Sequence, residues 1–198
     1  MPEWESIEGE TPIDPSGLKQ PGLVTNRRDL AATEAPNISK AFLKYLASKP
    51  SRRSACFDYA WFLQLHREMF GNVWHWAGSP RKHDLNLGIS HFQIPDQTSA
   101  LASDLLSWTG FGHPLLDQAV WLHHRAAYIH PFENGNGRWA RLLSNIWLKV
   151  NGERVVAWPD NLLGESSEIR GEYLASIRQA DGGDFSAFGE LHRRFQDV

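Results

Sequence analysis

The chain has 198 residues, 41% of them hydrophobic, which is enough for one domain with a sizeable core. Its formal net charge of −3 argues against a broad nucleic-acid-binding surface. A single cysteine excludes an internal disulfide, and no apolar run approaches the roughly 20 residues that span a bilayer. The acidic start also lacks the regions of a signal peptide. We therefore expect a cytoplasmic protein that binds no membrane and no nucleic acid directly.

Residues 1–28 are rich in proline, glycine and acidic side chains, and the stretch TPIDPSGLKQPG is typical of turns. We interpret this segment as an arm that lies on the domain or binds a partner. From Arg28 to Leu46 the apolar residues predict one helix, or two helices interrupted at Pro36. A further core helix is predicted from Ala55 to Phe70.

Helical periodicity stops between residues 70 and 95. Apolar residues alternate on both sides of Gly88, which provides a turn, so this stretch predicts a β-hairpin over about residues 78–95. Phe92 and Ile94 lie on its second arm. The remaining pattern predicts a mainly α protein, with helices at 98–108, 115–129, 138–150, 169–180 and 185–195.

The histidines outside the central motif do not have the spacing of a zinc site, because no carboxylate or cysteine accompanies the pairs that they form. We predict no zinc. His66, inside the predicted helix 55–70, is interpreted as a hydrogen-bonded histidine of the polar face or core. Tyr173 either approaches the functional site or packs in the core.

The most informative stretch is residues 130–141, HPFENGNGRWAR. Pro131 disfavours the α conformation at His130, so the preceding helix should end there and leave the imidazole on the rim of a turn. Residues 134–137 tolerate positive φ, which lets successive amides point into one concavity. Arg138 then opens a helix whose positive end faces the same place. This pattern predicts a phosphate site beside a histidine, whereas the alternative is a plain glycine-rich loop between helices.

The residue types in this motif suit group transfer. An arginine holds phosphate oxygens bidentately, and a histidine with an ordinary pKa of about 6.5 can take a proton from an incoming hydroxyl. Together these groups can move a phosphoryl or nucleotidyl group onto an alcohol.

The string closely resembles the signature of the Fic family, which reads HPF, any residue, Asp or Glu or Asn, GNGR, any two residues, Arg. Members commonly transfer AMP from ATP to a protein hydroxyl, so the resemblance implies a protein adenylyltransferase (AMPylase) that uses ATP and Mg²⁺. It implies these roles: His130 as the general base, Phe132 as the buried aromatic that fixes the loop, Gly135, Asn136 and Gly137 as the anion hole, Arg138 as the catalytic phosphate-holding residue, and Arg141 as the ligand of the terminal phosphate.

One position departs from the usual pattern of adenylylating members. Where they have an Asp or Glu that holds Mg²⁺, this chain has Asn134, and Glu133 precedes it. A neutral amide oxygen is a weaker ligand for a hard cation than a carboxylate. Either Asn134 binds the metal weakly, or Glu133 replaces it, or the chemistry differs.

The resemblance also implies a fold and a mode of target binding. It predicts a Fic-type helical bundle over residues 29–198, with the hairpin as a flap over the active site. In the family the flap pairs with the backbone of the target protein, so Phe92 or Ile94 is expected to clamp the target. The pattern of TPIDP, then GL, then Leu30, Glu34 and residues 37–38 resembles a Fic subgroup called mobile mystery protein B.

The sequence also bears on how the activity is regulated and on two alternative functions. Many Fic proteins are inhibited by a helix of the pattern Ser or Thr, three residues, Glu, then Gly or Asn, and this chain has no complete copy. We therefore expect a toxin-type enzyme restrained in trans by a small antitoxin whose glutamate pairs with Arg141. The alternatives are a kinase of the related Doc type, which Gly135 and Gly137 disfavour, and a non-catalytic nucleotide-binding module.

Overall fold

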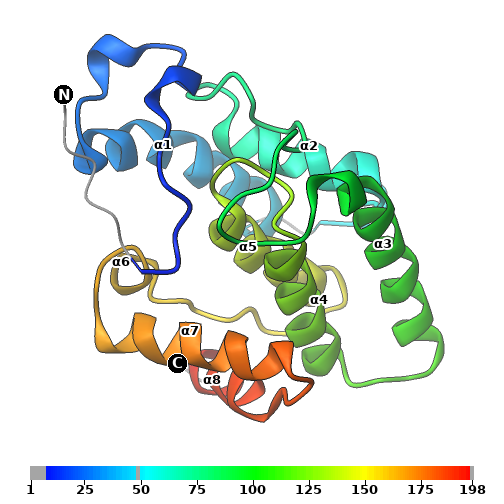
Figure 1. Cartoon of the computed structure of the whole chain (residues 1–198). Coiled ribbons are helices and arrows are strands. Elements are labelled where there is room, and N and C mark those ends of the chain that lie inside the picture. The colour runs from blue at the N-terminus through cyan, green and yellow to red at the C-terminus, as the bar shows by residue number, and fades with distance from the viewer. Residues whose placement is uncertain (1–7, 48–49, 197–198) are drawn as a thin grey trace.

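In the computed structural model, which describes residues 8–47 and 50–196, the regular structure is helical (Figure 1). The helices are α1 Arg27–Phe42, α2 Tyr59–Phe70, α3 Ile94–Gly110, α4 Leu115–Ile129, α5 Asn136–Val150, α6 Asp160–Leu163, α7 Glu168–Asp181 and α8 Ser186–Gln196. Single turns of 3-10 helix lie at Pro15–Gly17, Pro21–Leu23 and His91–Gln93, and a π-helical turn, Leu43–Ala47, extends α1. The predicted mainly α fold is confirmed.

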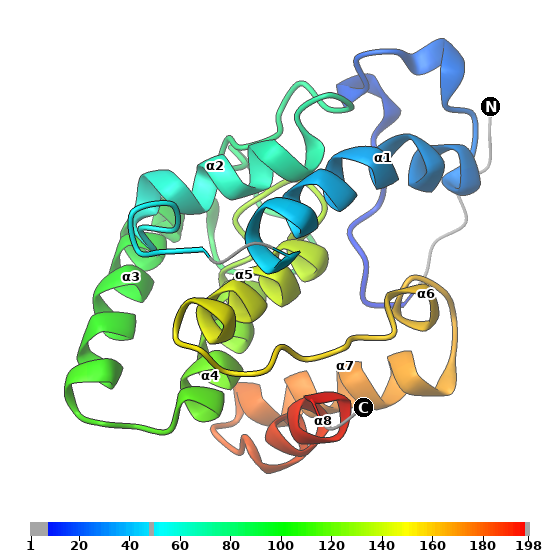
Figure 2. The same cartoon turned by 180° about the vertical axis from the view of Figure 1, so that it is seen from behind.

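Helix α5 is the central element of the bundle (Figures 1 and 2). Every residue from Trp139 to Leu148 is buried, as expected of a helix that neighbours surround on all sides. The Trp139 indole donates a hydrogen bond to the Phe62 carbonyl of α2 at 3.2 Å. The Asn145 amide pairs with both backbone groups of Val156 at 2.9 Å. These contacts fix α5, and with it the motif that opens it.

Helix α5 lies between two pairs of helices. Figures 1 and 2 show α1 and α2 along one side, and α7 and α8 along the opposite side. A smaller apolar cluster joins α7 and α8 to α4, and it consists of Val120, Leu163, Tyr173, Ala180, Phe188 and Leu191. In the described part of the chain, no helix is long and apolar enough to cross a membrane.

Helix α1 runs through Pro36 without a break, so of the two predicted alternatives the structure shows the single helix. Its buried residues Leu30, Glu34, Asn37 and Ala41 recur every three or four positions and form one continuous face. Packing of this face against α2 outweighs the single backbone hydrogen bond that Pro36 cannot donate.

The predicted β-hairpin is not confirmed, since residues 78–95 contain no strand and the described residues hold only an isolated bridge between Leu18 and Trp74. Side-chain hydrogen bonds from a buried arginine hold this stretch, in place of backbone pairing between strands. The Arg81 guanidinium donates to the carbonyls of His130 and His83, both at 2.8 Å, and to the Ile89 carbonyl. Proline suits the first turn of a helix, and Pro95 accordingly lies in the first turn of α3, where the second arm of a hairpin was predicted.

Candidate functional site

The predicted end of α4 is confirmed, because the helix stops at Ile129 and His130 takes the left-handed conformation, with φ 52° and ψ 59°. The His130 Nδ1 lies 3.3 Å from the Ala127 carbonyl oxygen, and Nε2 lies 3.1 Å from the Thr11 hydroxyl oxygen. A carbonyl can only accept, so Nδ1 carries the proton and Nε2 has a free lone pair. Burial lowers the pKa of His130 to about 4, and the nearby Arg81 adds to this effect. The ring is therefore neutral at pH 7 and able to accept a proton.

The loop between α4 and α5 is fixed by its own amide side chains. The Asn136 amide accepts from the Phe132 N–H at 2.9 Å and donates to the Phe132 carbonyl at 2.8 Å. Phe132 is fully buried beneath the loop, as predicted. The Asn134 side chain accepts from the Gly135 N–H at 2.7 Å. The predicted anion hole therefore has fewer free groups than expected, because the Gly135 N–H is already paired with the Asn134 side chain.

Helix α5 begins at Asn136, two residues before the predicted start, with Gly135 as its N-cap at φ 79°. The amides of residues 136–138 form the first turn, where no intrahelical carbonyl is available to accept from them. They face the same cavity as His130. The helix dipole adds a partial positive charge, so this turn suits an anion.

His66 supports the loop from below. Its Nδ1 accepts from the Gly78 N–H at 3.0 Å, so its Nε2 donates to the Asn134 carbonyl at 3.0 Å. The ring stacks on Phe132 with 3.6 Å between ring centroids. Burial lowers its pKa to about 3. His66 is hydrogen-bonded in the core, as interpreted from the sequence.

Each motif arginine is paired with a carboxylate from another part of the chain. Arg138 forms an ion pair with Glu34 of α1, a buried side chain that also accepts from the Trp74 indole at 2.6 Å. The Arg141 Nε donates to Asp160 of α6 at 2.8 Å. Although burial opposes its charge, Asp160 and Tyr173 hold the pKa of Arg141 above its ordinary value. Both guanidinium groups face the cavity.

A buried chain of hydrogen bonds leads from Tyr173 into the core. The His192 Nδ1 donates to the Phe188 carbonyl at 2.8 Å, which leaves its Nε2 to accept from His123 Nδ1 at 3.1 Å. His123 Nε2 must then accept from the Tyr173 hydroxyl at 2.9 Å. Because the Tyr173 hydroxyl donates its proton to His123, its oxygen lone pairs can accept from Arg141. The Arg141 guanidinium carbon lies 5.8 Å from the centroid of the Tyr173 ring.

Segments far apart in the sequence enclose one cavity of about 310 Å³. The predicted residues that line it are His130, Asn134, Gly135, Asn136, Gly137, Arg138 and Arg141. Tyr173 also lines the cavity and is buried, so both of its predicted alternatives hold in part. The cavity also contains groups that the sequence did not indicate: Glu10, Thr11, Arg27, Glu34, Asp160 and Arg170. Glu34 had one local signal, a charge on the buried face of α1, whereas the others come together only through the tertiary fold.

The remaining predicted site residues lie outside this cavity. The Glu133 carboxylate is 3.3 Å from His83 Nε2 and borders a neighbouring depression. Phe92 is 81% exposed on the 3-10 turn before α3. Ile94 is fully buried as the first residue of α3. A clamp role for Ile94 would therefore need its side chain to leave the core.

The possible metal ligands do not by themselves form a metal centre. The described residues contain no group of three His, Cys, Asp or Glu side chains close enough to hold a cation. The Asn134 oxygen accepts from its own loop, and Glu133 is the only carboxylate of the motif. Any Mg²⁺ here would need most of its ligands from a bound triphosphate and water.

Comparison with known sequences finds a family that the central part of the chain is similar to. Residues 56–148 match the Fic/DOC family. Protein adenylyltransferase fic-1 of Caenorhabditis elegans is 30% identical over 131 residues, which are 64% of this chain and 24% of that protein. Protein adenylyltransferase Fic of Nematostella vectensis is 29% identical over 153 residues, which are 74% of this chain and 34% of that protein. The chain thus spans about a quarter to a third of these curated relatives.

Solved structures show the same fold. Fic-1 from C. elegans superposes with a TM-score of 0.66 at 25% identity, over 82% of this chain and 48% of that one. BepC from Bartonella tribocorum, solved with bound AMPPNP, superposes with a TM-score of 0.68 over 96% of this chain and 94% of that one. Its identity is 16%, so this second likeness concerns the fold alone.

Proposed function

Because residues 56–148 of the chain match the Fic/DOC family, we propose that the protein is an adenylyltransferase that transfers AMP from ATP to a Ser, Thr or Tyr hydroxyl of a target protein. One observation carries this proposal. The neutral His130 Nε2 is hydrogen-bonded to a hydroxyl in the cavity where the first turn of α5 presents its amides. A base, an alcohol and an anion site therefore share one cavity of about 310 Å³.

The proposed reaction follows from these positions. His130 Nε2 takes the proton of the target hydroxyl, whose oxygen attacks the α-phosphorus of ATP in line. The bond from the α-phosphorus to the β-phosphate breaks, and pyrophosphate leaves. The amides of residues 136–138 and the Arg138 guanidinium stabilise the charge that develops on the phosphate oxygens. Arg141, which also lines the cavity, binds the terminal phosphate.

The nucleotide has to compete with groups of the protein. Arg138 is paired with Glu34 and Arg141 with Asp160, so the phosphates must displace these carboxylates or share the guanidinium groups with them. The names of the curated relatives, which are protein adenylyltransferases, support ATP as the substrate. Mg²⁺ would arrive with the ATP, and Glu133 or Asn134 would add one ligand at most.

The proposed protein binds its target near the start of α3 and is regulated by a partner protein. Phe92 is the exposed residue before α3 that is available to contact a target, whereas Ile94 is not. We also propose a toxin-type role with an antitoxin in trans, in the manner of the mobile mystery protein B subgroup. In that case the antitoxin's glutamate would compete with Asp160 for Arg141.

Two alternatives make different predictions for the same site. A Doc-like kinase would transfer the γ-phosphoryl group, and a non-catalytic module would bind ATP without transferring any part of it. Gly135 at the positive-φ N-cap favours adenylyl transfer over the Doc type, whose motif usually has a different residue there.

The test uses ATP labelled at either the α or the γ phosphate. The purified chain is incubated with each label, Mg²⁺ and a cell lysate, in parallel with His130→Ala and with His75→Ala, which replaces an exposed histidine away from the cavity. Protein label from the α position alone, lost only in His130→Ala, supports adenylyl transfer. Label from γ alone would assign the kinase activity instead, and no label with intact ATP binding would support the non-catalytic module.

A further inference from the structure

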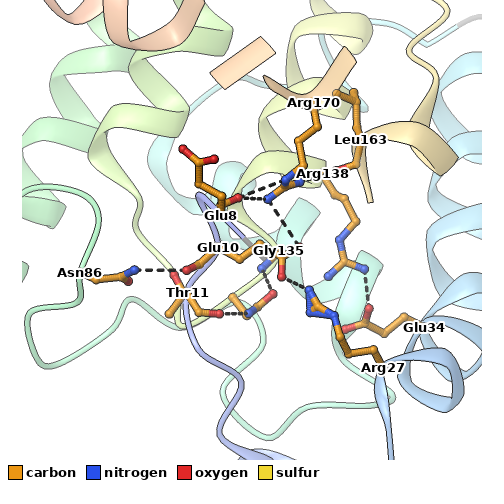
Figure 3. A network of polar contacts seen from close by, with 11 residues as sticks. Glu8, Glu10, Thr11, Arg27, Glu34, Asn86, Gly135, Arg138, Leu163 and Arg170 are labelled. Carbon is orange, nitrogen blue, oxygen red and sulfur yellow. Dashed lines mark hydrogen bonds and ion pairs between the residues drawn. The ribbon is translucent and has the colours of Figure 1, made fainter. Parts of the chain in front are cut away.

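The described part of the N-terminal arm enters the cavity and is held there by several polar contacts (Figure 3). The Arg170 guanidinium donates to the Glu8 carbonyl at 3.1 and 2.6 Å. The Glu10 carboxylate pairs with Arg27 of α1 and lies 3.8 Å from Arg170 of α7. The Asn86 amide donates to the Glu10 carbonyl at 3.1 Å. The arm is therefore attached to three separate parts of the bundle.

These contacts place the next residue, Thr11, against the general base. Thr11 is 6% exposed, and its hydroxyl oxygen lies 3.1 Å from His130 Nε2. Since His130 Nδ1 donates to the Ala127 carbonyl, Nε2 accepts, and the Thr11 hydroxyl is the donor. A hydroxyl that donates to the base is the arrangement that a nucleophile needs before proton abstraction.

The Thr11 backbone is also tied to the anion site. Its carbonyl accepts from the Asn134 side-chain amide at 3.3 Å, and the oxygen of the same side chain accepts from the Gly135 N–H at 2.7 Å. Gly135 caps α5, whose first-turn amides are the proposed phosphate ligands. A single side chain thus connects the residue that carries the hydroxyl with the loop that would hold the α-phosphate.

We propose that Thr11 is an acceptor of the AMP group in its own chain, so that the protein modifies itself at this residue. This inference rests on the proposed adenylyltransferase activity and names one of its substrates. The Thr11 oxygen forms a bond with the α-phosphorus of ATP, the bond from that phosphorus to the β-phosphate breaks, and pyrophosphate leaves. The Thr11 proton moves to His130 Nε2.

The geometry favours transfer within one molecule. The arm keeps the hydroxyl at the base without a separate binding step, and well-oriented intramolecular reactions reach effective molarities on the order of 10⁵–10⁸ M. The product would not fit the present arrangement, because Thr11 is buried and loses its hydroxyl proton. The modified arm must therefore leave His130, which would open the base to other hydroxyl groups.

The test measures intact mass and locates the modification by peptide sequencing after incubation with ATP and Mg²⁺. We expect the wild-type chain to gain one adenylyl group on Thr11, at a first-order rate that does not change when the protein is diluted tenfold. Thr11→Val should abolish this gain, Thr11→Ser should retain it at residue 11, and Thr33→Val, which removes an exposed hydroxyl of α1, should behave as wild type.

A lysate labelled in parallel separates this inference from the proposed function. Label on lysate proteins together with an unmodified Thr11 would overturn the self-modification and leave the adenylyltransferase activity intact. Modification of Thr11 at a rate proportional to protein concentration would overturn transfer within one chain. No label on Thr11 or on any lysate protein would overturn both proposals. Loss of His130-dependent label in Thr11→Ser would also contradict the role of the hydroxyl.

Discussion

At the scale of single residues, the site depends on backbone conformations that few residues adopt. His130 and Gly135 both have positive φ, and between them the chain turns from α4 into α5. A β-carbon at position 135 would lie 2.7 Å from the Phe70 ring and 3.3 Å from His66 Nε2. Glycine is therefore required at position 135 both by conformation and by close packing.

Gly135→Ala should consequently destabilise the protein by about 1–3 kcal/mol and weaken ATP binding, because the α5 amides would shift away from the phosphates. Chemical denaturation and ATP titration measure the two effects. Gly171→Ala is the matched control, since Gly171 lies within α7 and an added β-carbon there meets nothing within 4 Å. That control should be neutral or stabilising by up to about 1 kcal/mol. Equal destabilisation in both variants would contradict this account.

At the scale of elements, the cavity forms where α1 and α7 approach the start of α5. Helix α1 contributes Glu34, whose side chain is buried between Trp74 and Arg138. Its carboxylate places a negative charge beside the arginine that should bind phosphate. The contact therefore couples the packing of α1 to the affinity for an anion.

Glu34→Gln should tighten ATP binding by roughly three- to tenfold, because Arg138 no longer has to give up an ion pair when it binds a phosphate. At an effective dielectric constant of about 20 the attraction between two close charges is several kcal/mol, but the cost of removing both charges from water offsets most of it. The amide oxygen can continue to accept from Trp74, so the fold should persist. Isothermal titration with ATP measures the change. Glu172→Gln, which breaks an exposed ion pair with Arg194, provides the control. Weaker ATP binding in Glu34→Gln would show that Glu34 positions Arg138 and does not compete for it.

Helix α7 contributes Tyr173, through which the buried His123 and His192 orient the inner end of the cavity. Tyr173→Phe would leave the His123 Nε2 lone pair without a donor and should cost about 1–3 kcal/mol of stability. It should also raise KM for ATP more than it lowers kcat, because Arg141 loses an orienting neighbour. Tyr128→Phe, on the exposed face of α4, should change neither. An unchanged KM in a destabilised Tyr173→Phe variant would limit the hydrogen-bond chain to a structural role.

At the scale of the whole molecule, buried neutral histidines link stability to pH. Burial lowers the pKa of His66 to about 3, of His130 and His192 to about 4, and of His123 well below its ordinary value. Below pH 6.5 the unfolded chain binds protons that the folded chain does not. The contribution of these neutral histidines to the free energy of unfolding is complete above pH 6.5 and is lost as the pH falls toward 4.

The free energy of unfolding should therefore decrease between pH 6.5 and 4, with a slope on the order of 1.4 kcal/mol per pH unit for each histidine. Urea denaturation at several pH values measures this slope. His192→Asn, if it folds, should reduce the slope by about one proton, whereas replacing the exposed His75 by Asn should leave it unchanged. A stability that does not vary over this range would contradict the neutral, buried state of these rings.

The motif and its turn were predictable from the sequence because their signals are local. Pro131 ended α4 at the expected position, and seven residues of the motif line one cavity. Long-range contacts explain the differences. Arg81 replaces the expected hairpin by donating to carbonyls of distant residues, and packing on α2 carries α1 through Pro36. The approach of Thr11 to His130, 119 positions away, has no local signature at all.

The measurement that tests the central claim most directly compares AMP transfer and ATP affinity in the wild-type chain and in His130→Ala. The transfer rate from α-labelled ATP should fall by about 10²- to 10⁴-fold, as expected when a general base is removed. The dissociation constant for ATP should stay nearly the same, because the α5 amides, Arg138 and Arg141 remain. Transfer that persists in His130→Ala, or a parallel loss of ATP binding, would contradict the assignment of His130 as the base.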